Sequence, residues 1–194
     1  MKQALKTVFN FPSIASNCKS KPVWKFNVFM YLTALLITGL IMGCKKDREG
    51  VSGIEAQLNN LNHETASELR QAIEATRKYQ DIQKAYTDHY ADINVVMPNM
   101  GYHYMRSEIT DSVFEFKKPE LLVYNKKADS SFQLVAIEYA VPLNQSVHAP
   151  EGFTGEDDVW THSDVFGLWL LHAWVYTYNP EGIFHPTNPE IMVH

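Results

Sequence analysis

Two histidines and one glutamate have side chains suited to a metal site, and each lies in a run with the pattern of a β-strand. Glu138 lies in the run 132–141, where side chains alternate between two faces, and its face is otherwise apolar, with Phe132, Leu134, Ala136 and Ala140. A carboxylate among apolar neighbours must be paired, bind a metal ion or take up a proton, because an isolated buried charge is too costly. The position of Glu138 therefore predicts a partner close by.

His172 and His103 are the candidate partners. By the same alternation, His172 shares a face of the run 168–178 with Leu168, Leu170, Trp174 and Tyr176. His103 shares a face of the run 100–105 with Gly101 and Met105. Two imidazoles and one carboxylate that converge from three strands would bind Zn²⁺ or Fe²⁺ and leave coordination positions open. The sequence thus predicts a candidate metal site, which would serve a metal-dependent enzyme or a metal carrier.

Two alternatives use the same three residues without a metal. A buried Glu–His pair hydrogen-bonded to a tyrosine would satisfy them, and the candidate tyrosines are Tyr104, Tyr139 and Tyr176. This pair is favoured over a metal ion, because no short ligand spacing such as HxH or HExxH links the three residues. The other alternative is a pocket for an organic ligand.

Thioether sulfurs near His103 suggest a further metal, Cu(I). The set would be Met97, Met100, His103 and Met105. Methionine is also a common filler of gaps in a core, so Met97 and Met100 are expected instead to pack the end of a helix against the sheet.

An acidic run, Glu156-Asp157-Asp158 with Glu151 nearby, raises the possibility of a Ca²⁺ site. The run lacks the alternating ligand spacing of a calcium-binding loop. It is therefore expected to be a solvated connection.

The familiar catalytic motifs are missing from the sequence. There is no G-x-S-x-G motif and no glycine-rich phosphate loop. His172 or Glu138 could serve as an acid or a base, but the pattern supplies no partner group for either. The sequence therefore names no reaction.

The elements that must position these residues fall into two parts. Ser52 with Glu55 and Thr65 with Glu68 have the spacing of helix-capping boxes, and apolar residues recur at helical spacing as far as Ile93. This helix must end before Pro98. Short β-type runs follow, namely 100–105, 113–116, 121–124, 132–141 and 168–178.

Turn signals connect these runs. The polar segment 125–130 predicts an antiparallel hairpin between its flanking runs, and Asn179-Pro180-Glu181-Gly182 predicts a type I turn. The fold class is therefore predicted to be α+β, a single domain over 54–194 with N-terminal helices packed on a mostly antiparallel β-sheet. Residues 54–97 would be helical and residues 98–194 mainly β.

The first 43 residues have the pattern of an export signal. They carry five lysines and no acidic residue, followed by an apolar run from Phe29 to Met42 that is short for a membrane-spanning helix. A retained membrane helix is therefore the weaker alternative. The run ends at Ile41-Met42-Gly43-Cys44, which resembles the lipobox of bacterial lipoproteins. That resemblance implies cleavage before Cys44, a diacylglycerol on its sulfur and anchoring to the membrane through lipid.

The residues after Cys44 predict a tether and a destination. Residues 44–53 would form the lipidated cysteine and a short charged tether. Lys45, Lys46 and Asp47 are similar to the tags of gram-negative lipoproteins sent to the outer surface, which implies the outer membrane. The only other cysteine, Cys18, lies in the signal, so the mature chain has no disulfide.

Charge argues against one class of partner. Removal of residues 1–43 takes away five of the 17 basic residues and none of the 22 acidic ones. The mature chain would then carry a net charge of about −10 and be repelled by phosphates, so nucleic-acid binding is not expected.

Several pieces of the domain, taken together, resemble a widespread family of exported bacterial proteins of unknown function. The resemblance covers roughly residues 69–192 and rests on the segments 75–81, 100–104, 134–142, 171–174, 179–184 and 188–189. It implies export and a single domain but supplies no reaction. Where relatives carry an aromatic residue and a cysteine, this sequence has Thr187 and Met192, so any disulfide of the relatives is absent.

These observations predict a lipid-anchored protein of the cell envelope. Its expected role is that of a binding or structural module, with a small ligand or another envelope component as partner. The alternative is the metal-dependent enzyme or metal carrier that would use His103, Glu138 and His172.

Overall fold

A computed structural model describes residues 43–193, with side chains described from Ser52 onward. The helices are α2 (Gly43–Asn60), α3 (His63–Thr76) and α4 (Ile82–Thr87), with short 3₁₀ turns at Arg77–Gln80 and Ser107–Ile109. The strands are β1 (Ala91–Met97), β2 (Gly101–Met105), β3 (Leu121–Lys126), β4 (Phe132–Pro142), β5 (Thr161–Ser163) and β6 (Leu168–Ala173).

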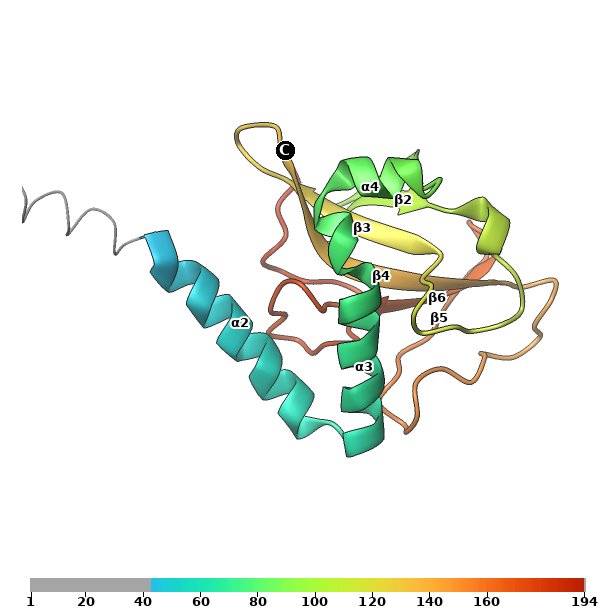
Figure 1. Ribbon diagram of the computed structural model, residues 1–194. Coiled ribbons are helices and arrows are strands. Elements are labelled where there is room, and N and C mark those ends of the chain that lie inside the picture. The colour runs from blue at the N-terminus through green and yellow to red at the C-terminus, as the bar shows by residue number, and fades with distance from the viewer. Residues whose placement is uncertain (1–42, 194) are drawn as a thin grey trace, which may run out of the picture. The chain divides into compact units, whose positions relative to one another are not determined.

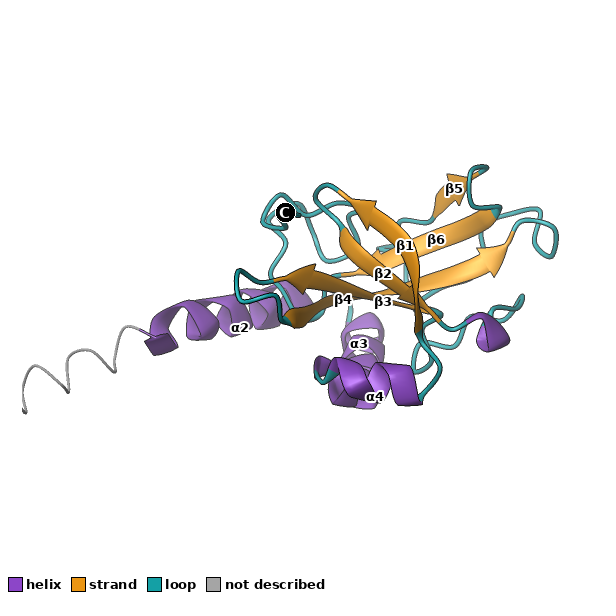
Figure 2. Ribbon diagram, turned by 90° about the horizontal axis from the view of Figure 1, so that it is seen from above, coloured by secondary structure: helices purple, strands orange, loops and turns teal. Residues whose placement is uncertain are grey.

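All six strands form one antiparallel sheet in the order β1-β2-β3-β4-β6-β5. Figure 1 labels β2 to β6, and Figure 2 also labels β1. The α+β fold with a mostly antiparallel sheet is thereby confirmed. Helices α3 and α4 lie on one side of the sheet (Figure 2). The main core is formed by their apolar side chains, such as Leu69 and Ala85, and by side chains of one sheet face, such as Leu122 and Ile137.

The predicted N-terminal helices differ from the structure in their capping and their extent. Asn62 caps α3 by accepting from the amide of Thr65 at 2.8 Å, whereas Thr65 and Glu68, the predicted capping pair, instead hold Thr154 in a distant loop. The helix ends at Thr76, and the short α4 ends at Thr87.

The prediction that residues 54–97 are helical is wrong for the last part of that range. His89 has a left-handed backbone with φ of 69°, which no helix continues through, and residues 91–97 form β1. The β-branched residues Ile93, Val95 and Val96 favour a strand, and pairing with β2 overrides the helical spacing of the apolar stripe.

Residues 45–53, predicted as a tether, lie within α2. Charged residues such as lysine, arginine and glutamate are good helix formers, so the lack of an apolar pattern does not exclude a helix. Farther along α2, Ile54 and Leu58 are buried in the main core. None of the helices in the described part of the chain is long and apolar enough to cross a membrane.

Most of the predicted strands are present. The hairpin of β3 and β4 is confirmed, and a 3.1 Å hydrogen bond from the Gly182 amide to the Asn179 carbonyl closes the predicted turn. Residues 113–116 were predicted as a strand but lie in a loop, where Phe114 and Phe116 pack on the core. The last strand, β6, ends at Ala173 instead of continuing to Tyr178, and β5 was not predicted.

A bulge in β4 changes which side chains share a face with Glu138. Val123 of β3 pairs with Ala136 and Tyr124 pairs with Leu134, so Val135 is an extra residue in β4. Leu134 therefore points to the helix-covered face with Ile137, whereas Ala136 points to the opposite face. The prediction that Phe132 and Leu134 share the face of Glu138 is wrong, because the alternation restarts at this bulge.

Candidate metal centre

Three neighbouring parts of the sheet bring the predicted site residues together. Glu138 of β4 lies directly opposite His172 of β6 in the ladder. His103 of β2 pairs with Val123 of β3, which in turn pairs with Ala136, two positions before Glu138. Side chains at these register positions project from one face, the face opposite α3 and α4, so strands far apart in the sequence converge there.

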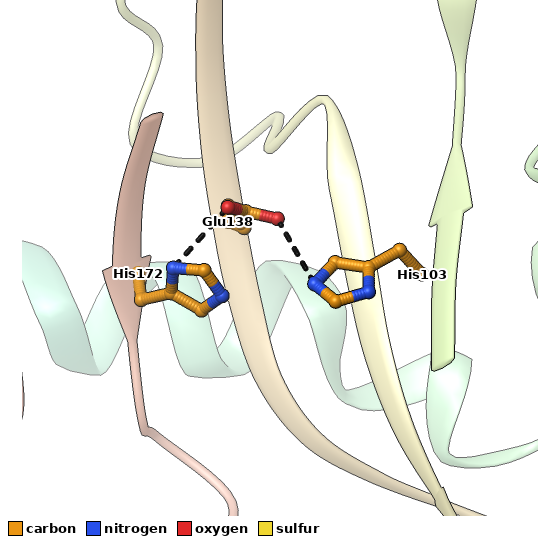
Figure 3. Close-up of side chains that lie close together, drawn as sticks. All are labelled: His103, Glu138 and His172. Carbon is orange, nitrogen blue, oxygen red and sulfur yellow. Dashed lines mark ion pairs between the residues drawn. The ribbon is translucent and has the colours of Figure 1, made fainter. Parts of the chain in front are cut away.

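The ligand atoms of the three residues are close enough to surround one ion. Figure 3 shows both imidazole rings turned toward the Glu138 carboxylate. His172 Nδ1 lies 3.2 Å from Oε1 and His103 Nε2 lies 3.7 Å from Oε2 of this carboxylate. One ligand atom from each residue can be chosen so that all three lie within 4.8 Å of one another. Ligands bound about 2 Å from a common ion are roughly 3 to 4 Å apart, so small side-chain adjustments would close this set.

The three side chains are buried, with 4% of His103, 1% of Glu138 and 3% of His172 exposed. Burial raises the pKa of Glu138 to about 8. Burial also lowers the pKa of His172 to about 3, with a further contribution from the charge of His103. Desolvation lowers the pKa of His103 as well, against the opposing effect of the Val95 and Gly101 carbonyls. Without an ion, burial therefore disfavours the charged form of all three groups.

Hydrogen bonding fixes the tautomer of His103. Its Nδ1 lies 3.1 Å from the carbonyl oxygen of Val95, which can only accept, so Nδ1 carries the proton and donates it. Nε2 is then left with a lone pair that faces the carboxyl group of Glu138. A histidine that donates one ring N–H to a backbone carbonyl and presents the other nitrogen is the usual form of a metal ligand.

His172 leaves one buried nitrogen unsatisfied. Its Nε2 has no hydrogen-bond partner among the described residues, and the ring of Trp174 stacks on its ring at 5.8 Å and 18°. If His172 donates its Nδ1 proton to Oε1 of Glu138 and a protonated Glu138 donates to His103 Nε2, the contacts at the carboxyl group are satisfied, but His172 Nε2 keeps a buried lone pair without a donor. A cation bound by the two Nε2 lone pairs and the Glu138 carboxylate would satisfy all three residues.

The tyrosines predicted to satisfy a buried Glu–His pair have other partners. Tyr139 donates to the Phe116 carbonyl at 2.7 Å and Tyr176 donates to the Ile73 carbonyl at 2.8 Å. Tyr104 packs in the main core on the other face. The predicted buried contact between Glu138 and a histidine is present. The tyrosine part of the prediction is wrong, because Tyr104 and Tyr139 alternate away from the site and because β6 ends before Tyr176.

The proposed Cu(I) set is not supported by the orientation of His103. One ring nitrogen donates to Val95 and the other faces Glu138, so neither is directed at a methionine. Met97 is exposed at the end of β1 and does not pack the end of a helix.

The acidic run near Asp158 is a loop, as expected. Asp158 accepts a hydrogen bond from the Phe153 amide at 2.8 Å, and Glu156 and Asp157 are exposed. In the described part of the chain, the cluster at His103 is the one group of three such ligands close enough to hold an ion.

A second buried carboxyl group, which no sequence pattern singled out, lies outside this cluster. Glu120 precedes β3, and its Oε2 accepts from the Ala140 amide at 3.0 Å. Burial raises the pKa of Glu120 from 4.5 to about 8, despite the opposing effect of this hydrogen bond. A glutamate just before a strand carries no signal of burial, because only the tertiary fold covers it.

The raised pKa of Glu120 predicts that the free energy of unfolding depends on pH. Its pKa is higher in the folded than in the unfolded chain, so the folded state binds more protons between pH 4.5 and about 8, and stability is lost as the pH rises through this window. Glutamine keeps the acceptor for Ala140 and does not ionise. We expect Glu120→Gln to match the wild type near pH 4 and to exceed it by about 3 kcal/mol at pH 7. Denaturant unfolding across this range measures the difference, and a difference independent of pH would contradict the prediction.

The predictions about export concern another part of the chain. The signal over residues 1–43 lies, apart from Gly43, outside the described residues, and Cys44 falls in the first turn of α2. The resemblance to a family of exported proteins stays a prediction. Comparisons of the chain with protein-family models, with curated proteins and with solved structures found no match.

Proposed function

We propose that this chain is a lipid-anchored envelope protein that binds one divalent metal ion, Zn²⁺ or Fe²⁺, through His103, Glu138 and His172. The observation that carries the proposal is the orientation of His103. Its Nδ1 donates to Val95 and its Nε2 lone pair faces Glu138, while His172 Nε2 lies buried without a hydrogen-bond partner in the described chain. A buried imidazole lone pair without a donor is satisfied when it binds a metal ion, and the other two residues would complete the ligand set.

The burial of the three ligands favours a holding role over turnover. A catalytic metal keeps one coordination position open to water or substrate, whereas a structural or carried ion is enclosed by protein. Three protein ligands leave a fourth position, but all three side chains are buried and Trp174 stacks on His172, which restricts access of a substrate to that position. The geometry therefore supports a metal-binding module better than a metal-dependent enzyme.

The proposed location rests on the sequence around Cys44. A basic segment, a short apolar run and Gly43-Cys44 support export and lipidation, and the acidic mature chain supports the absence of nucleic-acid partners. A metal site outside the cytoplasm would be assembled without disulfide support, because Cys18 would be removed with the signal.

Elemental analysis tests the metal directly. The full chain, purified in detergent without chelators, is expected to contain about one zinc or iron ion per molecule, since its three ligands surround one position. His103→Ala and His172→Ala are expected to lose the ion. His89→Ala is the matched control, because His89 is exposed and contacts Glu108 outside the cluster, and it should retain the ion.

Folded wild-type protein that contains no metal and takes up none from added Zn²⁺ or Fe²⁺ would overturn the proposal. Loss of the ion from His89→Ala as well would show adventitious binding and would also count against it. If an alanine variant fails to fold, Glu138→Gln provides the test, because it keeps the size of the side chain.

A further inference from the structure

The edge strand β1 departs from regular pairing directly opposite His103. Asp92 pairs with Tyr104 and Val96 pairs with Tyr102, so three residues of β1, Ile93 to Val95, face the single residue His103. The extra residues form a bulge. Bulges bend an edge strand and redirect groups that a regular ladder would hold in the plane of the sheet.

Asn94 sits at the centre of this bulge with a left-handed backbone, at φ of 57°. Its amide donates to Oδ1 of Asp92 at 2.7 Å, which closes a local turn. Asparagine tolerates this conformation, whereas a β-branched residue does not, because its Cβ substituents clash with the backbone. Asn94 therefore allows β1 to accommodate the two additional residues.

The bulge has a direct consequence for His103. Carbonyl groups of a regular ladder point at the backbone of the next strand, so they do not reach a side chain that projects from the sheet face. The Val95 carbonyl lies within the bulge and accepts from His103 Nδ1 at 3.1 Å. The irregular backbone thus supplies the acceptor that fixes the tautomer.

We infer that Asn94 is a positioning residue for the metal centre, an inference that rests on the metal-binding function proposed above. Its left-handed backbone shapes the bulge, the bulge aims the Val95 carbonyl at His103 Nδ1, and the resulting tautomer presents Nε2 to the ion. In this scheme Asn94 is not itself a ligand of the ion. It acts through the backbone of β1.

The test compares three variants of the full chain in detergent. Asn94→Val, which disfavours the left-handed backbone, is expected to weaken Zn²⁺ binding by about 10- to 100-fold, the usual effect of disturbing a ligand's hydrogen-bond partner. Asn94→Gly permits the same backbone and is expected to restore binding. Ser130→Val is the matched control, because Ser130 has φ of 66° in the distant β3–β4 turn, and it should bind Zn²⁺ like the wild type.

Nitrogen NMR of the histidine rings in metal-free protein gives a second readout that does not depend on metal. His103 is expected to carry its proton on Nδ1 in the wild type and in Asn94→Gly, and to shift toward the Nε2 tautomer in Asn94→Val. Asn94→Ala, a milder change, replaces Asn94→Val if the latter does not fold.

The outcomes separate the two proposals. A wild type that binds no Zn²⁺ but shows the expected tautomers overturns the metal function and leaves the role of Asn94 in place. A folded Asn94→Val variant with an unchanged His103 tautomer, or a wild type protonated on Nε2, overturns the inference about Asn94. Equal loss of binding in Ser130→Val would show a general effect of strain and would also overturn it.

Discussion

Added Zn²⁺ is expected to raise the free energy of unfolding of the wild-type chain by about 4 kcal/mol when free Zn²⁺ is roughly a thousand times the dissociation constant, and to add little to the variant Glu138→Gln. The reason is linkage: an ion that binds only the folded state stabilises that state. In the unfolded chain the three ligands are far apart in the sequence and present no joint site. Glutamine keeps the shape of Glu138 but cannot provide a negative charge to the ion.

Denaturant unfolding of the full chain in detergent, with Zn²⁺ and then with a chelator, measures this effect. Glu120→Gln is the matched control, because it also replaces a buried carboxyl group by an amide but lies outside the cluster, and it should gain as much stability from Zn²⁺ as the wild type. A wild type whose unfolding is the same with Zn²⁺ and with chelator would contradict the prediction. So would an equal gain in Glu138→Gln.

We expect the replacement of Cys44 by serine to abolish the proposed acylation and the proposed cleavage before residue 44. A serine oxygen does not form the thioether that holds the diacylglycerol, so a lipid label expected on the wild type should be absent from Cys44→Ser. The variant is also expected to migrate as the longer, uncut chain. Metabolic labelling with a fatty acid and gel mobility measure both effects.

Cys18→Ser is the control for this experiment. Cys18 is the other cysteine of the chain and lies in the segment that would be removed, so its loss should change neither the label nor the mobility of the mature protein. If the unaltered chain carries no label and has the mobility of Cys44→Ser, it is neither acylated nor cut, and the lipoprotein proposal fails.

The sheet was predictable where side-chain pattern and backbone agree. In β4 the run of apolar and aromatic residues leaves a strand as the simplest structure, and the polar turn before it sets the hairpin with β3. For β1 the side-chain pattern led to the wrong prediction of a helix, because Tyr86, Tyr90 and Ile93 also fit a helical stripe. The left-handed residue His89, which separates the two elements, has no signal of its own in the sequence.

The three residues of the candidate site were predictable from the sequence, but the groups that surround and orient them were not. Glu138, His103 and His172 were identified because each is a polar residue in a strand-like run, and antiparallel register then brings Glu138 opposite His172. The bulges at Val135 and Asn94 depend on how two strands pair, which a single strand's pattern does not contain. The partners of the site were therefore expected among tyrosines, whereas the structure supplies the Val95 carbonyl and the Trp174 ring.

The bulge in β1 also affects the tendency of copies of this chain to aggregate when they are close together. A sheet edge that is long and flat can recruit the edge of another molecule and start a fibril, because its free amides and carbonyls form a ready ladder. Here one edge is β1, which is interrupted opposite His103, and the other is β5, which has only three residues. Neither edge offers a long, straight strand, and this disfavours edge-to-edge pairing between the sheets of neighbouring molecules.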